Sequence, residues 1–175
     1  MDRIVNREAL EQVRETSKAQ IENSRCRILI CAGTGCLAGG SGQIYEKMCE
    51  LVKEHPDVEV HFGPEIAHGD GEIGVKKSGC HGFCEMGPLM RIEPQGILYT
   101  KVKPEDCDEI FHRTIEKGDV IRHLLFKQDG IEYRKQEEIP FYKKQTRNVL
   151  RNCGHIDAEH IQEYISTGGY KALEK

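Results

Sequence analysis

Two pairs of cysteines, each in a glycine-rich stretch, constrain this chain more than any other feature. Four residues separate Cys31 from Cys36, and three separate Cys80 from Cys84. A fold that brought the two pairs together would make a cage of four thiolates, which are ligands for zinc and for iron–sulfur clusters. The sequence therefore predicts a metal site, and the metal that fills it decides the function.

The overall composition indicates one ordinary domain with appendages. The chain has 175 residues, of which 38% are hydrophobic and 31% charged, and its formal net charge is −4. This charge argues against a general nucleic-acid-binding protein, which would normally be basic. No apolar run is long enough to cross a membrane, and the N-terminal sequence contains no apolar signal segment. We therefore expect a cytoplasmic protein whose eight cysteines are reduced rather than paired in disulfides.

Hydrophobic patterns predict an α/β fold between residues 26 and 118. We expect strands over 27–31, 58–62, 89–92 and 96–102, helices over 41–55 and 104–118, and an irregular segment over 63–78. Ser41 is the expected cap of the first helix, and Pro104 is expected to open the second. This order indicates a thioredoxin-like mixed sheet with flanking helices, in which the first two strands run parallel and the last two form a hairpin. Both cysteine pairs would then lie in loops at neighbouring ends of the sheet.

Helical patterns also occur on both sides of this region. Residues 6–23 have a thin apolar stripe, which suggests a helix that packs on a surface or on a partner. A last helix is expected over 158–166, capped by Asp157, and little sequence surrounds it to cover its apolar side chains. We therefore expect its partner to be missing. The predicted organisation is an N-terminal helical extension (1–25), a thioredoxin-like domain (26–120) and a C-terminal segment (121–175).

Spacing alone leaves the identity of the metal open. Tetrathiolate zinc sites use similar spacings, so a structural zinc module that docks subunits is the alternative. The glycines beside the cysteines favour a [2Fe–2S] cluster, because they allow left-handed turns that point backbone N–H groups at sulfur. Such hydrogen bonds would stabilise the reduced cluster and raise its potential. These glycines are Gly33, Gly35, Gly79 and Gly82.

Other interpretations of the same residues are less favoured. Residues 33–38 fit a dinucleotide-binding fingerprint, but the next expected strand does not end in an acidic residue, and the cysteines would have no role. No C-x-x-C redox motif occurs. His81 adjoins Cys80, but a Rieske site needs two histidines, so we interpret His81 as a loop residue. The other cysteines are expected to be buried or partly buried packing residues: Cys26, Cys49, Cys107 and Cys153.

Residues 31–36 and 75–88 resemble the thioredoxin-like [2Fe–2S] ferredoxin module that is fused to the flavoprotein subunit of NADH dehydrogenases. Residues 139–145, 147–154 and 156–170 resemble the beginning of the flavin domain in that subunit. Within the family, the resemblance is to the diaphorase subunits of soluble NAD(P)-linked [FeFe]-hydrogenases, including electron-bifurcating ones.

This resemblance implies that Cys31, Cys36, Cys80 and Cys84 bind the cluster and that the module relays single electrons between FMN and other iron–sulfur clusters. It implies other subunits of an NADH dehydrogenase or hydrogenase complex as partners, and it allows a homodimer. The sequence ends at Lys175, before a glycine-rich flavin-binding segment. We therefore expect the FMN, NAD and [4Fe–4S] sites to lie in a missing remainder of the parent subunit, which 121–175 would begin. No catalytic residue, nucleic acid or membrane span is expected here.

Overall fold

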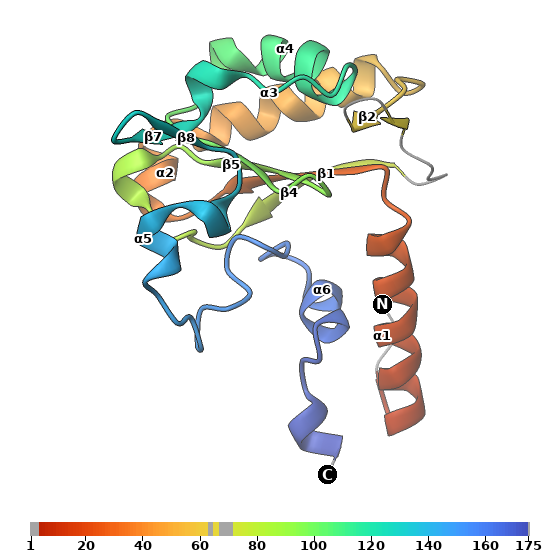
Figure 1. The fold of residues 1–175 in the computed structure, drawn as a ribbon. Coiled ribbons are helices and arrows are strands. Elements are labelled where there is room, and N and C mark those ends of the chain that lie inside the picture. The colour runs from red at the N-terminus through yellow and green to blue at the C-terminus, as the bar shows by residue number, and fades with distance from the viewer. Residues whose placement is uncertain (1–3, 63–64, 67–71, 175) are drawn as a thin grey trace.

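A four-stranded mixed sheet forms the centre of the molecule (Figure 1). The computed structural model describes residues 4–62, 65–66 and 72–174. The strand order is β4-β1-β5-β6, with β1 parallel to β4 and antiparallel to β5, and with β5 and β6 joined as a hairpin. The strands are β1 (Cys26–Cys31), β4 (Ile73–Ser78), β5 (Met90–Glu93) and β6 (Ile97–Tyr99). The predicted thioredoxin-like α/β class is confirmed.

The parallel partner of β1 is not the predicted one. We expected residues 58–62, but that stretch contains only β2 (His61–Phe62), which pairs with β3 (Glu65–Ile66) in a separate small sheet. The partner is β4, which lies in the segment that we predicted to be irregular. Because β4 is an edge strand, only its end residues are buried, and the glycine and lysines between them hide the strand pattern. The rest of that segment, 63–64 and 67–71, lies outside the described residues.

Helices on one face of the sheet complete the larger core (Figure 1). They are α3 (Ser41–Glu54) and a continuous helical stretch made of η2 (Pro104–Asp106), α4 (Cys107–Glu109) and the π-helical turn η3 (Ile110–Ile115). Pro104 opens the second helix as predicted, whereas the N-cap of α3 is Gly40 and not Ser41. The chain enters α3 through a left-handed backbone conformation at Gly40 (φ 95°), which glycine adopts more easily than other residues. The buried side chains here include Ile28, Ile30, Ile44, Met48, Met90, Ile92 and Phe111.

The opposite face of the sheet carries a smaller apolar cluster. Side chains alternate along β6, so that Leu98 belongs to this cluster while Ile97 and Tyr99 face the larger core. The cluster also contains Cys31, Cys36, Phe83, Leu89, Ile139 and Tyr142. Two of these residues come from the C-terminal segment, which therefore contributes to the packing of the domain.

The C-terminal segment covers the edge strand β6. The part of it next to β6 contains an unpredicted hairpin and three short helical elements, and its backbone bridges β6 at Ile97↔Lys135 and Tyr99↔Leu125. Pairing of this kind satisfies the free backbone groups of an edge strand. The elements are η4 (Arg122–Leu124), β7 (Phe126–Gln128), β8 (Ile131–Tyr133), η5 (Gln136–Glu138) and α5 (Pro140–Lys143).

The first and last α-helices lie side by side, away from α3 and α4 (Figure 1). They are α1 (Arg7–Glu22) and α6 (Ile161–Ser166), followed by η6 (Lys171–Glu174). Arg14 of α1 donates hydrogen bonds to the carbonyl oxygens of Ile165 (3.3 Å) and Gly169 (3.4 Å). The expectation that the last helix lacks a partner was therefore wrong. No described helix is long and apolar enough to span a bilayer.

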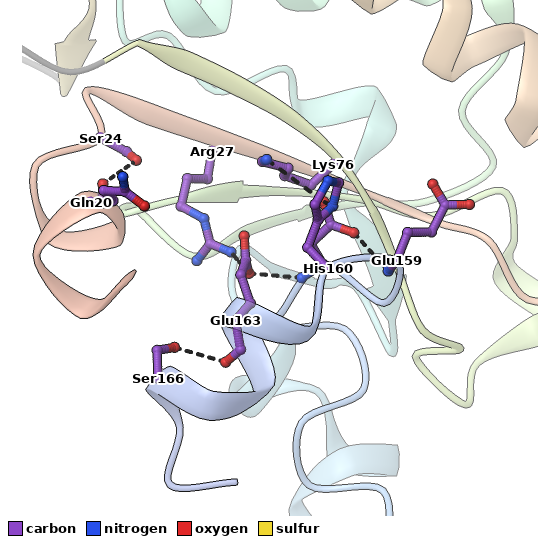
Figure 2. A network of polar contacts seen from close by, with 9 residues as sticks. Gln20, Ser24, Arg27, Lys76, Glu159, His160, Glu163 and Ser166 are labelled. Atoms are coloured by element: carbon purple, nitrogen blue, oxygen red, sulfur yellow. Dashed lines mark hydrogen bonds and ion pairs between the residues drawn. The ribbon is translucent and has the colours of Figure 1, made fainter. Parts of the chain in front are cut away.

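Polar contacts attach α6 to the sheet (Figure 2). Arg27 of β1 forms an ion pair with Glu163, and both side chains are about nine-tenths buried. Lys76 and Lys77 of β4 form ion pairs with Asp157 (3.7 Å) and Glu159 (3.3 Å), respectively. The N-cap of α6 is His160 rather than the predicted Asp157, because the Asp157 side chain instead accepts hydrogen bonds from the Glu159 backbone and from His160.

Candidate metal centre

The parallel pairing of β1 and β4 places both cysteine loops at one edge of the sheet. Cys31, the last residue of β1, lies opposite Ser78, the last residue of β4. Because the carboxyl ends of parallel strands meet at the same edge, the loop after each strand starts beside the other. The structure therefore brings together the two pairs that the sequence analysis singled out.

The first pair is buried in regular structure. Cys31 ends β1 and is 0% exposed, and Cys36 lies in the short helix α2 (Thr34–Ala38) and is 1% exposed. We predicted no helix in this glycine-rich loop. A hydrogen bond from the Cys36 thiol lowers the pKa of Cys31 to about 6, against the effect of burial, and backbone groups of His81 and Gly33 lower it further. The same hydrogen bond, together with burial, raises the pKa of Cys36.

The second pair lies closer to the surface. Cys80 follows β4 and is partly buried, and Cys84 opens the turn η1 (Cys84–Met86) and is exposed. Their Sγ atoms are 3.7 Å apart. Two thiolates on one tetrahedral metal at about 2.3 Å would be about 3.8 Å apart, so this pair has the spacing of a chelate. Burial raises the pKa of Cys80, and the opposing effect comes from the Gly82 N–H, which donates to its Sγ at 3.4 Å.

Glycines allow the two loops to interlock. A Cβ atom at Gly33 would lie 3.0 Å from Cys80 Cβ, and one at Gly87 would lie 2.7 Å from Cys36 Sγ. A Cβ at Gly35 would lie 3.6 Å from Cys84 Cβ. The first loop therefore packs directly on both cysteines of the second. Gly82 has φ 82° and is the flanking glycine that adopts the predicted left-handed conformation.

The donor set fits a [2Fe–2S] cluster, which takes two thiolates on each of its two irons. The four cysteines form two such pairs, and backbone N–H groups point at sulfur in each. Within residues 4–62, 65–66 and 72–174, no group of three or more His, Cys, Asp or Glu side chains lies close enough together to hold a single metal ion. The fit to the cluster therefore rests on the arrangement of the four cysteines as two pairs, one for each iron.

His81 is more than the loop residue that we predicted. It is fully buried, and its ring lies 2.8 Å from Ser78 Oγ and 3.0 Å from Gln136 Oε1. Burial lowers the pKa of His81 to about 4, so the ring is neutral at physiological pH. The sequence analysis missed Gln136, because no local pattern links it to a cysteine loop 55 residues away.

The remaining cysteines are placed as predicted. Cys26 and Cys107 are buried in the larger core, and Cys49 and Cys153 are partly buried. Burial raises the pKa of both Cys26 and Cys107 to about 12. These two thiols are therefore protonated packing residues.

Comparisons with known proteins agree on the nature of the domain. The chain is 31% identical over 104 residues to a 2Fe-2S ferredoxin of Clostridium pasteurianum. This alignment covers 58% of the chain and 96% of that ferredoxin. It is 27% identical over 93 residues to a 2Fe-2S ferredoxin of Aquifex aeolicus (strain VF5), covering 53% of the chain and 74% of the relative.

A solved structure is also similar. The wild-type thioredoxin-like [2Fe-2S] ferredoxin from Aquifex aeolicus aligns with a TM-score of 0.47 at 22% identity, over 60% of this chain and 99% of that one. Residues 18–114 match the thioredoxin-like [2Fe-2S] ferredoxin family. The match spans more than half of the sequence and includes all four cysteines of the site. This chain therefore belongs to the thioredoxin-like [2Fe–2S] ferredoxin family.

Proposed function

We propose that the chain is a one-electron carrier whose [2Fe–2S] cluster is held by Cys31 and Cys36 on one iron and by Cys80 and Cys84 on the other. The observation that carries this proposal is the interlocking of the two loops, with the second pair at chelating distance, 3.7 Å, and packed against Gly33 of the first. Membership of the family supports the same cofactor.

The protein residues have three roles in this proposal. When bound, the cluster accepts and releases one electron. Backbone N–H groups beside Cys31 and Cys80 stabilise the negative charge on sulfur, as outer-shell hydrogen bonds do at metal sites. The buried first pair shields one side of the site, while the exposed Cys84 leaves an edge for electron exchange. No side chain has to transfer a proton.

We further propose a setting for this carrier. The resemblance of residues 139–170 to the start of a flavin domain supports a place in the flavoprotein subunit of an NADH dehydrogenase or an [FeFe]-hydrogenase complex. The module would then relay electrons between FMN and other iron–sulfur clusters, with the other subunits as partners. FMN, NAD and a [4Fe–4S] cluster would bind outside this chain. The cytoplasm suits such a site, because it keeps thiols reduced.

Anaerobic purification followed by metal analysis tests the proposal. We expect a coloured protein with about two irons and two sulfides per chain, which takes up one electron from dithionite and then gives an electron paramagnetic resonance signal. Colourless protein with one zinc would overturn it in favour of the structural zinc module. Reduction of an acceptor by NADH with the pure chain alone would contradict the role as a carrier without its own catalytic site.

A further inference from the structure

Residues beyond the family domain reach back to the loop that carries the second cysteine pair. The family match ends at residue 114, yet Gln136, Tyr142 and Arg147 all contact residues Cys80 or His81. The C-terminal segment therefore contacts the second cysteine loop, which we define as residues 79–84.

Two of these contacts fix His81. The Tyr142 hydroxyl donates a hydrogen bond to the His81 carbonyl oxygen at 3.1 Å. The His81 ring lies between Gln136 Oε1 and Ser78 Oγ, and with Nδ1–H donating to the amide oxygen, Nε2 accepts from the hydroxyl. Both the backbone and the ring of the residue after Cys80 are thus held, so the direction of the Cys80 side chain is constrained.

Arg147 adds a positive charge at the same place. Its Nη2 lies 3.4 Å from the Cys80 carbonyl oxygen, and its Nη1 is buried with no hydrogen-bond partner among the described residues. No carboxylate in the described part of the chain pairs with this guanidinium. A partly buried cation without a counter-charge is unfavourable, and a thiolate at Cys80 would supply that counter-charge.

We propose that Arg147 sets the reduction potential of the cluster and positions Cys80, so that the C-terminal segment completes the redox site. This inference rests on the proposed function, since it assumes a cluster on the four cysteines. Reduction adds one negative charge to the cluster. A nearby positive charge stabilises that state, more strongly in a partly buried site than in water. Arg147 therefore raises the potential.

Three variants of the full chain test the proposal by redox titration. Arg147→Gln removes the charge, Arg147→Lys keeps it, and Arg151→Gln removes the same charge from an exposed position four residues away. We expect Arg147→Gln to shift the one-electron equilibrium about tenfold toward the oxidised form, which lowers the midpoint potential by about 59 mV. Arg147→Lys should retain most of the potential, and Arg151→Gln should shift the equilibrium less than about twofold, because solvent screens exposed charges.

Hydrogen exchange of the metal-free chain gives a readout that does not depend on the cluster. Exchange of the amides in residues 79–84 should be faster in Arg147→Gln and in Tyr142→Phe than in the wild type, and unchanged in Arg151→Gln. Equal potentials in the wild type and Arg147→Gln, or equal shifts in the two glutamine variants, would overturn the proposal. A wild-type chain without iron would overturn the proposed function instead, and the exchange rates would still decide whether Arg147 holds the loop.

Discussion

The first cysteine pair lies on a strand and a helix inside the molecule, whereas the second lies on an irregular loop near the surface. Cys31 and Cys36 are fixed by apolar packing and are almost fully buried. Cys80 and Cys84 are more exposed, and the loop between them is held by the buried Phe83 side chain and by polar contacts from the C-terminal segment. The first half of the site thus depends on apolar packing, and the second half depends on polar contacts as well.

Because of this difference, the first pair should matter more for the stability of the fold, and the second pair more for the redox properties of the cluster. Apolar burial contributes most to the free energy of folding, so the first pair shares the stability of the whole domain. Polar contacts at a partly exposed loop contribute less, but they determine charge and geometry near the cluster. We therefore expect substitutions near the first pair to affect folding and substitutions near the second to affect redox behaviour.

The largest expected effect is that of Leu98→Ala, which removes a fully buried side chain packed with the first pair. Loss of burial and the resulting cavity should reduce the free energy of unfolding by about 2–5 kcal/mol, measured by urea denaturation of the metal-free chain. Phe141→Ala is the matched change beside the second pair, where Phe141 stacks on Phe83 but is 41% exposed. This change should reduce the free energy of unfolding by less than half as much as Leu98→Ala does. Equal losses would show that the core supports both pairs alike.

A smaller effect is expected at the contact between the two loops. Gly33→Ala would place a methyl group 3.0 Å from Cys80 Cβ, and the required shift should cost about 1–3 kcal/mol and lower the iron content. Gly42→Ala is the control, because nothing lies within 4 Å of its Cβ position in α3. Because Gly42 lies in the first turn of α3, a glycine-to-alanine change there should raise the free energy of unfolding by less than about 1 kcal/mol. Full iron loading of the Gly33 variant would show that the loops adjust independently.

The smallest effect on stability near neutral pH is expected from ionisation of the buried thiols of Cys26 and Cys107. Their reactivity, however, should differ strongly from that of the second pair. Because burial raises the pKa of Cys26 and Cys107 to about 12, their thiolate fraction should be about a thousandfold below that of an ordinary thiol at pH 8. Alkylation of the metal-free chain, mapped by mass spectrometry, should reach the exposed Cys84 well before them.

The pH dependence of these two thiols has a definite sign. Their folded-state pKa is raised, so deprotonation favours the unfolded chain. Their contribution to stability should be complete below about pH 8.5 and should decrease as the pH rises toward about 12. Rapid alkylation of Cys26 in the folded chain at pH 8 would contradict this assignment.

Several elements could be predicted from sequence because their own residues carry the signal. β1 is a short apolar run, α3 has a helical stripe, and β5 and β6 flank a turn with proline and glycine. β4 could not be predicted, because it is an edge strand whose Gly74, Lys76 and Lys77 interrupt any apolar pattern. The pairing of α1 with α6 was also hidden, since neither sequence indicates its partner.

The residues of the candidate site also fall into those that could be predicted from sequence and those that could not. Spacing and flanking glycines were enough to single out the four cysteines. The contributions of Gln136, Tyr142 and Arg147 depend on contacts over 55 to 67 residues of sequence. No periodicity or motif marks Gln136, and the resemblance that singled out the stretches containing Tyr142 and Arg147 does not indicate a contact with the cysteines. Only the folded chain brings them to the second cysteine loop.

The pairing of α1 with α6 has a consequence for the order of folding. The hydrogen bonds from Arg14 join residues that are 151 and 155 positions apart. Short helices are marginal in isolation, and closing so long a loop carries a large entropic penalty unless the intervening chain is already compact. These two helices should therefore assemble last and open first. Their amide protection would report whether a molecule has finished folding.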